Sequence, residues 1–396
     1  MLNRNRLLSA QVTSGFSQWI DIFLIFSMPV FVWDATPKDI GVIALFFALP
    51  SLLLSPIVGS LVDSRNPYRI MVIGAILRVL FTFFIVINQS YIIFIMLVFL
   101  KGVSNVMYWA SASVVTNQVV NTENRMSYFS SLSAIDQTTK VLTPLVMIPI
   151  SSLFSLKDGF ILSLLLSLFA LFVVRSISYK YLGQAKEILF SYAKLFSGFK
   201  ELKFIPNQLL VHITFSMLLA ISLAIYDPHL PSFIKSLHMG ESTYSIIISA
   251  TAIGAITGAL FVKSIFKSFG PVLLSKIGFI LFAFSILIVN ILLLTLGSIP
   301  LPIIIFIWFL NGCGYELFMI GYGVNFQNTC PKEVLGKVST SARSFQMLII
   351  MLTPSVGAYF IDNFSFISVY LISIIILSIS LLLMLYFKNI FRDKQA

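Results

Sequence analysis

One stretch of the chain is long and apolar enough to decide the fold class. Residues 271–295 read PVLLSKIGFILFAFSILIVNILLLT, and Lys276 is the only charged residue among these 25 positions. A helix that crosses a membrane needs ~20 consecutive, mostly apolar residues, whereas an apolar run of ~10–14 residues is typical of a buried helix in a soluble core. The stretch therefore predicts a transmembrane helix.

The same pattern recurs on both sides of this stretch. Hydropathy predicts twelve spans in the 396 residues, or about 33 residues for each span with its connection. The apolar runs are continuous, unlike the alternating segments of a membrane β-barrel, so we expect an all-α membrane protein with twelve transmembrane helices. The expected spans are 8–33, 40–62, 70–88, 91–116, 127–154, 159–179, 206–227, 242–262, 271–295, 300–324, 337–360 and 365–387.

The composition excludes the main soluble classes of protein. The chain is 58% hydrophobic and 10% charged, with a mean hydropathy of +0.98. A soluble chain averages about 45–50% apolar and about 25% charged residues, so a cytosolic enzyme is excluded. The net charge of +11 would suggest nucleic acid in a soluble protein. Here the basic residues fall in alternate connections, and we expect no nucleic-acid partner.

The distribution of lysine and arginine predicts the orientation. Of the 26 basic residues, twenty lie at one set of span ends and three at the other. Positively charged connections stay in the cytoplasm, so both termini are expected there, in a multi-pass protein of the inner (cytoplasmic) membrane. The remaining three fall inside spans, namely Arg78, Lys101 and Lys140.

A long basic connection predicts how the chain is divided. Residues 180–205 alternate lysine with apolar residues, which is typical of an amphipathic helix on the inner membrane surface. The expected parts are a six-helix half over 1–179, this linker, and a second six-helix half over 206–396.

Short internal repeats support two similar halves. The sequence LTPLV at 142–146 recurs as LTPSV at 352–356, and GSL at 59–61 is echoed by GAL at 258–260. Both pairs occupy the same place within each half. Transporters built from parallel repeats bind their cargo near the membrane midplane, where the repeats meet.

Three segments carry a resemblance to a known family. The sequence GSLVDSRNPYR at 59–69 resembles the signature between the second and third helices of the major facilitator superfamily, with Ser64 where a basic residue is usual. The sequences GFKELK at 198–203 and QNTCPKEVLGKV at 327–338 are similar to its macrolide-efflux-like branch. The resemblance implies two pseudo-symmetric six-helix halves, alternating access, and export of drugs or siderophores.

Carboxylates inside predicted spans are the candidates for proton coupling. An ionisable side chain at the centre of a span costs at least ~2.5–3.5 kcal/mol and usually marks an ion path. Asp21, Asp136 and Glu316 are such residues. Each also has a structural interpretation, as a partner in an interhelical hydrogen bond or ion pair. Asp136 and Lys140 lie four residues apart and share one helix face, so they are expected to pair.

Cations inside the spans are expected to act on these carboxylates or on the cargo. The resemblance implies that Lys101 adjusts the proton affinity of a nearby carboxylate, and both Asp21 and Asp136 remain open as that partner. Arg78 and Lys140 are the other candidates. His212 is either a proton carrier or a hydrogen-bonded filler.

The remaining candidates concern cargo and movement. Polar and aromatic side chains beside the charged positions predict a cavity for an amphiphilic compound. Its candidates are Gln18, Gln137, Trp109 and Tyr315. The superfamily signature implies a conformational latch at the ends of the helices, formed by Gly59, Asp63, Arg69 and Arg343.

These observations predict a proton-coupled antiporter that exports an amphiphilic organic compound, with small-molecule, proton and lipid partners and a monomeric state. Alternatives are a siderophore or metallophore exporter and a lipid flippase. The chain has no GxxxxGK[ST] loop for ATP-driven transport and no HExxH motif. Two of its three histidines fall in an expected outer loop over 228–241, too few ligands for a metal site. We expect no enzyme activity, cofactor or metal.

Overall fold

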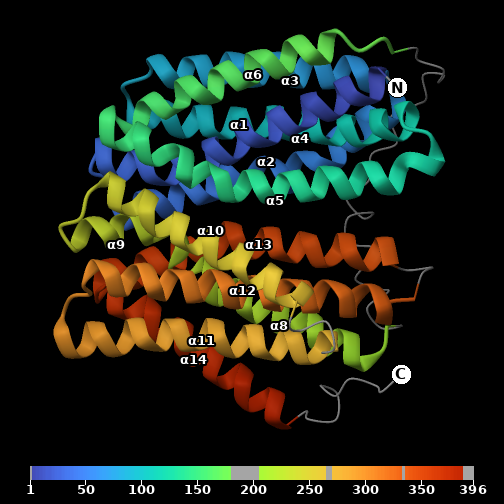
Figure 1. Ribbon diagram of the computed structural model, residues 1–396. Helices are drawn as coiled ribbons and strands as arrows, with labels where there is room; N and C mark the ends of the chain where they lie inside the picture. Colours follow the sequence, from blue (N-terminus) through green and yellow to red (C-terminus); the bar gives the residue numbers. More distant parts are fainter. Residues whose placement is uncertain (1, 180–204, 265–269, 332–334, 387–396) are drawn as a thin grey trace. The chain divides into compact units, whose positions relative to one another are not determined.

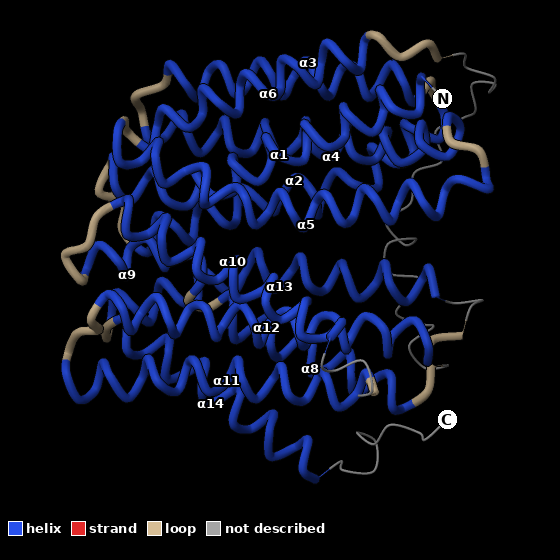
Figure 2. Tube along the Cα trace, in the orientation of Figure 1, coloured by secondary structure: helices blue, strands red, loops and turns tan. Residues whose placement is uncertain are grey.

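The computed structural model describes residues 2–179, 205–264, 270–331 and 335–386. Helices and their connecting loops account for all of these residues (Figure 2). The chain divides into two compact units, of which the first holds Met1–Ala35 with Val42–Tyr192 and the second holds Thr36–Gly41 with Ala193–Ala396.

The first unit is built around α1, which contacts α6, α5 and α4, while α3 packs on α4 and α6 (Figure 1). Its elements are α1 (Leu2–Val32), α2 (Pro37–Ser64), α3 (Pro67–Ile87), α4 (Tyr91–Val119), α5 (Thr122–Leu153), the short 3-10 helix η1 (Leu156–Asp158) and α6 (Gly159–Arg175).

The second unit is built around α12, which packs on α10 and α11, while α8 contacts α13 and α14. Its elements are α8 (Asn207–Ala224), the 3-10 helix η2 (Asp227–His229), α9 (Leu230–Ser236), α10 (Glu241–Ser264), α11 (Pro271–Leu296), α12 (Leu301–Thr329), α13 (Leu335–Asn363) and α14 (Phe366–Tyr386).

Local sequence sets several helix ends. The side chain of Asn66 accepts hydrogen bonds from the backbone N–H groups of Tyr68 and Arg69, and Pro67 opens α3. These groups have no partner inside the helix, and proline at the first position loses no helical hydrogen bond. A glycine ends α11 at its C-terminus. Gly297 follows the last helical residue and has a φ of 67°, a left-handed conformation that favours glycine.

Small residues let α10 and α12 approach closely. A Cβ atom on Gly254 would lie 1.9 Å from the carbonyl oxygen of Phe309, and one on Gly312 would lie 1.9 Å from that of Thr251. Side chains larger than hydrogen do not fit at these two positions. Small residues at such positions let the backbones of two membrane helices come into contact.

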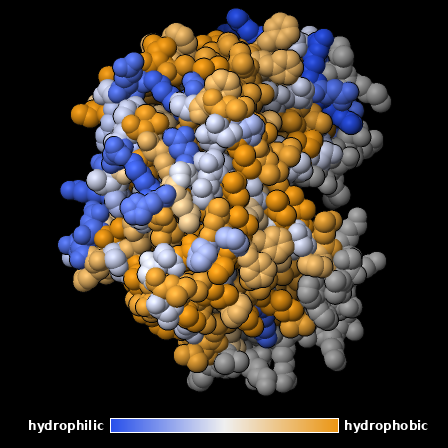
Figure 3. Space-filling model, turned by 60° about the vertical axis from the view of Figure 1, so that its left-hand side comes forward, coloured by the Kyte–Doolittle hydropathy of each residue, from blue (hydrophilic) through white to orange (hydrophobic). Residues whose placement is uncertain are grey.

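Eleven described helices are long and apolar enough to cross a membrane, and α5 contributes a shorter apolar segment over Thr138–Leu153. Each of the twelve predicted spans coincides with a helix, so the all-α membrane fold is confirmed. Exposed side chains on the face in Figure 3 are mainly hydrophobic, as lipid contact requires.

Two details of the prediction are wrong. The sixth helix ends at Arg175 rather than at 179, where Ser176 and the following residues leave the helical hydrogen-bond pattern. The expected loop over 228–241 contains part of η2 and all of α9, because Pro231 at the first turn starts a further short helix. The expected amphipathic linker lies outside the described residues, apart from residue 205.

Candidate functional site

The first unit contains a buried ion pair between α1 and α4. The Lys101 Nζ atom lies 2.7 Å from Asp21 Oδ1, and each residue is only 1% exposed. Burying either charge alone is costly, and a partner at this distance offsets much of the cost. Of the two carboxylates that the sequence left open for Lys101, the structure places Asp21 beside it.

Hydroxyl groups from two further helices surround the ion pair, and together with it they form the ion-pair junction. Ser163 on α6 donates to Asp21 Oδ1 at 2.5 Å, and Lys101 donates to Thr82 Oγ1 on α3 at 2.5 Å. Ser17 joins the same network through Ser163, at 2.9 Å between their oxygens. Asp21 Oδ2 is buried and has no hydrogen-bond partner among the described residues. That oxygen is therefore an unfilled acceptor position within the cluster.

Arg78 adds a second buried cation close to this junction. Its Nη2 atom donates to the carbonyl oxygen of Ser14 at 2.8 Å, and its guanidinium carbon lies 5.2 Å from the centre of the Tyr108 ring. Thr82, one turn further along α3, donates to the Arg78 carbonyl oxygen at 2.7 Å.

A second polar cluster lies between α1 and α5. Trp19 Nε1 donates to Asp136 Oδ1 at 3.0 Å, and Lys140 Nζ lies 5.4 Å from the centre of the Trp19 ring. Asp136 is half-buried and Lys140 is exposed. The expected contact between Asp136 and Lys140 stays a prediction.

Two glutamines extend the polar face of α1. Trp109 Nε1 on α4 donates to Gln18 Oε1 at 2.5 Å, which joins two of the expected cavity residues. Gln11 accepts a hydrogen bond from Tyr128 on α5 and donates to Thr116 on α4. The side chain of Gln137 lies outside the described part of the chain.

The second unit has an uncharged cluster of polar contacts on α8, α11, α12 and α14, which correspond to α1, α3, α4 and α6 of the first unit. Asn311 Nδ2 on α12 donates to Tyr226 Oη at 3.2 Å and to Ser285 Oγ on α11 at 3.0 Å. Ser222 on α8 and Ser373 on α14 lie 2.6 Å apart, oxygen to oxygen.

These contacts repeat those of the first unit with neutral groups. Tyr226 follows Asp21 by 205 positions, and Asn311 follows Lys101 by 210. The serine pair of α8 and α14 follows Ser17 and Ser163 by the same two intervals. The ionic contact of one unit therefore has an amide and a phenol as its counterpart in the other.

The other predicted site residues are dispersed. Glu316 and Tyr315 are half-buried on α12, where the Tyr315 ring lies 6.4 Å from that of Phe282. His212 is buried on α8. His229, expected in an open loop, is buried, with Nε2 at 2.8 Å from the carbonyl oxygen of Pro354.

The expected latch stays a prediction. Gly59 lies in α2 with open space where a Cβ would stand, and Arg69 is exposed in the first turn of α3. The side chains of Asp63 and Arg343 lie outside the described residues.

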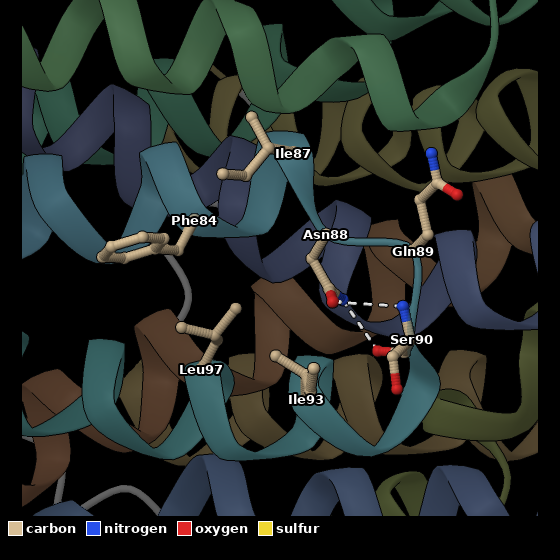
Figure 4. A pocket seen from close by; sticks show the side chains of 7 residues that line it. All are labelled: Phe84, Ile87, Asn88, Gln89, Ser90, Ile93 and Leu97. Atoms are coloured by element: carbon tan, nitrogen blue, oxygen red, sulfur yellow. Dashed lines mark hydrogen bonds between the residues drawn. The ribbon is translucent and has the colours of Figure 1, made fainter.

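A pocket of about 620 Å³ lies where α3 is connected to α4 (Figure 4). Asn88 holds the turn through hydrogen bonds with the backbone of Ser90. Ile87 and Ile93 on its wall are more than half exposed, and the pocket includes no charged residue. Its lining suits lipid chains and is separate from the ion-pair junction.

Sequence reasoning missed the hydroxyl partners. Ser163 and Ser167 lie one turn apart in an apolar helix, and Ser17 precedes Asp21 by one turn. Such spacing places hydroxyls on one helix face, which is the signal that could have found them. Trp19 is not among the predicted cavity residues, because its acceptor Asp136 lies 117 positions away in the sequence.

Comparison with known proteins gives one family. A family model described as "Major Facilitator Superfamily" matches residues 7–288 and 213–395. The "Uncharacterized MFS-type transporter YfiS" of Bacillus subtilis (strain 168) is 32% identical over 74 residues, which are 19% of this chain. The matched segment spans only 18% of that relative's length.

Solved structures share the fold over nearly the whole chain. The nucleoside transporter NupG aligns with a TM-score of 0.72 at 14% identity, covering 100% of both chains. A bacterial homolog of the human lysosomal transporter Spinster, inward-facing and unoccupied, gives 0.70 at 12% identity, covering 100% of this chain and 99% of that one. A POT family transporter in complex with 5-aminolevulinic acid gives 0.70 at 11%, covering 98% and 96%. At these identities the likeness shows the fold alone.

Proposed function

Because the chain belongs to the Major Facilitator Superfamily, we propose that it is a secondary transporter, not an enzyme, that exports an amphiphilic organic compound in exchange for protons. The observation that carries the coupling is the buried contact between Asp21 and Lys101. The resemblance of two loop sequences to macrolide-efflux-like proteins supports export rather than import. The distribution of basic residues supports placement in the cytoplasmic membrane with both termini inside.

The ion pair supplies a physical route from proton to movement. Asp21 and Lys101 lie on different helices, so their contact holds α1 against α4. Protonation of Asp21 removes one charge and with it the attraction, while an intact pair opposes protonation. The proton and the closed contact between α1 and α4 therefore compete for the same carboxylate, which is the requirement for coupling a proton to a conformational change.

Inward movement of protons is the driving force in this proposal, and the electrical part depends on the net charge moved in each cycle. Moving one elementary charge across the membrane supplies ~2.3 kcal/mol per 100 mV. A proton arriving from outside would load Asp21 in the outward-open state, and its release inside would restore the ion pair. Cargo leaves in the opposite direction, in the alternating-access cycle that two similar halves support.

The experiment is cargo-dependent proton movement in proteoliposomes that hold the purified full-length chain. Amphiphilic compounds are enclosed in the vesicles when they are formed, and the external pH is recorded. We expect Asp21→Asn to abolish proton movement while binding of the compound persists. Asp362→Asn, which removes an exposed carboxylate at the end of α13, is the matched control and keeps the wild-type response.

Two outcomes separate the alternatives. Proton movement that persists in Asp21→Asn but is lost in Glu316→Gln would move the coupling site to the second unit. Transport of the compound without proton movement in the wild type would contradict antiport and favour a uniporter or a lipid flippase.

A further inference from the structure

Trp19, Asp136 and Lys140 form a polar cluster that reaches the surface of the first unit. Asp136 is the fifteenth residue of α5, about 21 Å along a helix that rises 1.5 Å per residue. Asp136 precedes the apolar segment Thr138–Leu153 and Lys140 lies in its first turn, and for a half-buried carboxylate and an exposed ammonium contact with water is favoured over contact with lipid chains. Trp19 on α1 is half-buried beside them.

The two indoles of this region present ring faces rather than N–H donors. Trp19 Nε1 is bound to Asp136, and Trp109 Nε1 is bound to Gln18. With both N–H groups occupied, what each ring offers to a ligand is its π surface. The face of an indole is negative and attracts cations, and tryptophan is the strongest of the aromatic side chains in this respect.

A cation of the protein already lies over one of these faces. Lys140 Nζ is 5.4 Å from the Trp19 ring centre, within the ~6 Å range of an energetic cation–π contact. The same indole donates to the Asp136 carboxylate at 3.0 Å, so carboxylate and ring form one negative surface. Lys140 is exposed and its long side chain has several rotatable bonds, so a competing cation can displace its ammonium from this surface.

From this arrangement, and resting on the proposed export function, we infer that the cargo is a hydrophobic organic cation, which displaces the Lys140 ammonium from Trp19 and Asp136. Lys140 is then an internal competitor that occupies the cation site when no cargo is bound. An anionic cargo would instead use Lys140 as its partner, and removal of Lys140 would weaken its binding. The two classes of cargo thus predict opposite effects of the same substitution.

The test uses two probes of matched shape and opposite charge, tetraphenylphosphonium and tetraphenylborate. Their binding to the full-length protein in detergent is measured by calorimetry at one pH and without a gradient, and heats in empty micelles are subtracted. We expect Lys140→Met to tighten tetraphenylphosphonium binding roughly two- to tenfold and Asp136→Asn to weaken it by a similar factor. Lys38→Met, at an exposed position in α2, is the matched control and leaves the affinity unchanged.

Three results would overturn the inference. The first is tighter binding of tetraphenylborate than of tetraphenylphosphonium to the wild type. The second is weaker binding of tetraphenylphosphonium to Lys140→Met. The third is the same affinity for tetraphenylphosphonium in Lys140→Met and Lys38→Met, or no binding to either. Asp21→Asn tests the proposed function separately, because it is expected to lose proton movement while it retains cation binding.

Discussion

At the scale of single residues, the two charges of the Asp21–Lys101 pair depend on each other. Both are buried, so removal of one leaves the other without its partner in a medium of low dielectric constant. Breaking a buried pair in this way typically costs about 3–5 kcal/mol, whereas replacing both members by neutral groups of similar size is often close to neutral.

We therefore expect Lys101→Met to lower the thermal stability of the purified protein strongly, and the double variant Asp21→Asn with Lys101→Met to recover most of the loss. The measurement is the melting temperature of each variant in one detergent. Recovery of stability without recovery of proton movement would assign the pair to coupling rather than to folding. Equal melting temperatures for the single and double variants would contradict the mutual dependence of the charges.

The limits of sequence reasoning are clearest at this same scale. Burial cost in a membrane identified Asp21, Lys101 and Asp136 as unusual residues, and that argument needs no structure. It did not reveal which residues meet, because Lys101 contacts a carboxylate 80 positions away and Asp136 accepts from Trp19 across 117 positions. Such pairs are set by how helices pack, which hydropathy does not encode.

At the scale of elements, α10 and α12 pack with their backbones in direct contact at glycine residues. A Cβ on Gly312 would lie 1.9 Å from the Thr251 carbonyl oxygen, whereas one on Gly323 of the same helix meets open space. The two glycines form a matched pair, since Gly→Ala has the same intrinsic effect on helix formation at both.

We expect Gly312→Ala to destabilise the protein by about 1–3 kcal/mol through overpacking, and Gly323→Ala to leave its stability unchanged or slightly higher. Thermal unfolding of the two variants in parallel measures the difference. Similar melting temperatures for both would show that α10 and α12 can move apart without cost.

Element positions were the most predictable feature of the fold. All twelve apolar runs correspond to helices because a span needs a minimum apolar length, which the sequence displays directly. The ends were less predictable. Residues 230–236 form α9 where a loop was expected, because a short helix beside a span carries no hydropathy signal of its own.

At the scale of the whole molecule, the two units share one arrangement of polar contacts between helices, but only the first unit has charged residues in it. Each unit joins its first and last helices through a serine pair. A side chain of α4 or α12, Lys101 or Asn311, bonds a hydroxyl of the preceding helix and also Asp21 on α1 or Tyr226 just after α8. In the first unit the latter contact is ionic, between Asp21 and Lys101, and in the second it is neutral, between Tyr226 and Asn311. A phenol and an amide do not exchange protons near neutral pH, so only the first junction is suited to carry one.

This asymmetry predicts different effects of substitutions in the two units. Tyr226→Phe removes the hydroxyl that accepts from Asn311 and keeps the ring in its tilted contact with Tyr370, so we expect a loss of about 0.5–1.5 kcal/mol in stability. The number of protons exchanged per cargo molecule should not change. Thr82→Val removes the hydroxyl that accepts from Lys101 in the first unit, and we expect it to shift the pH dependence of transport. Proton stoichiometry in proteoliposomes tests the first expectation, and the rate of transport as a function of pH tests the second. A Tyr226→Phe protein that moves fewer protons per cargo would place a coupling step in the second unit as well.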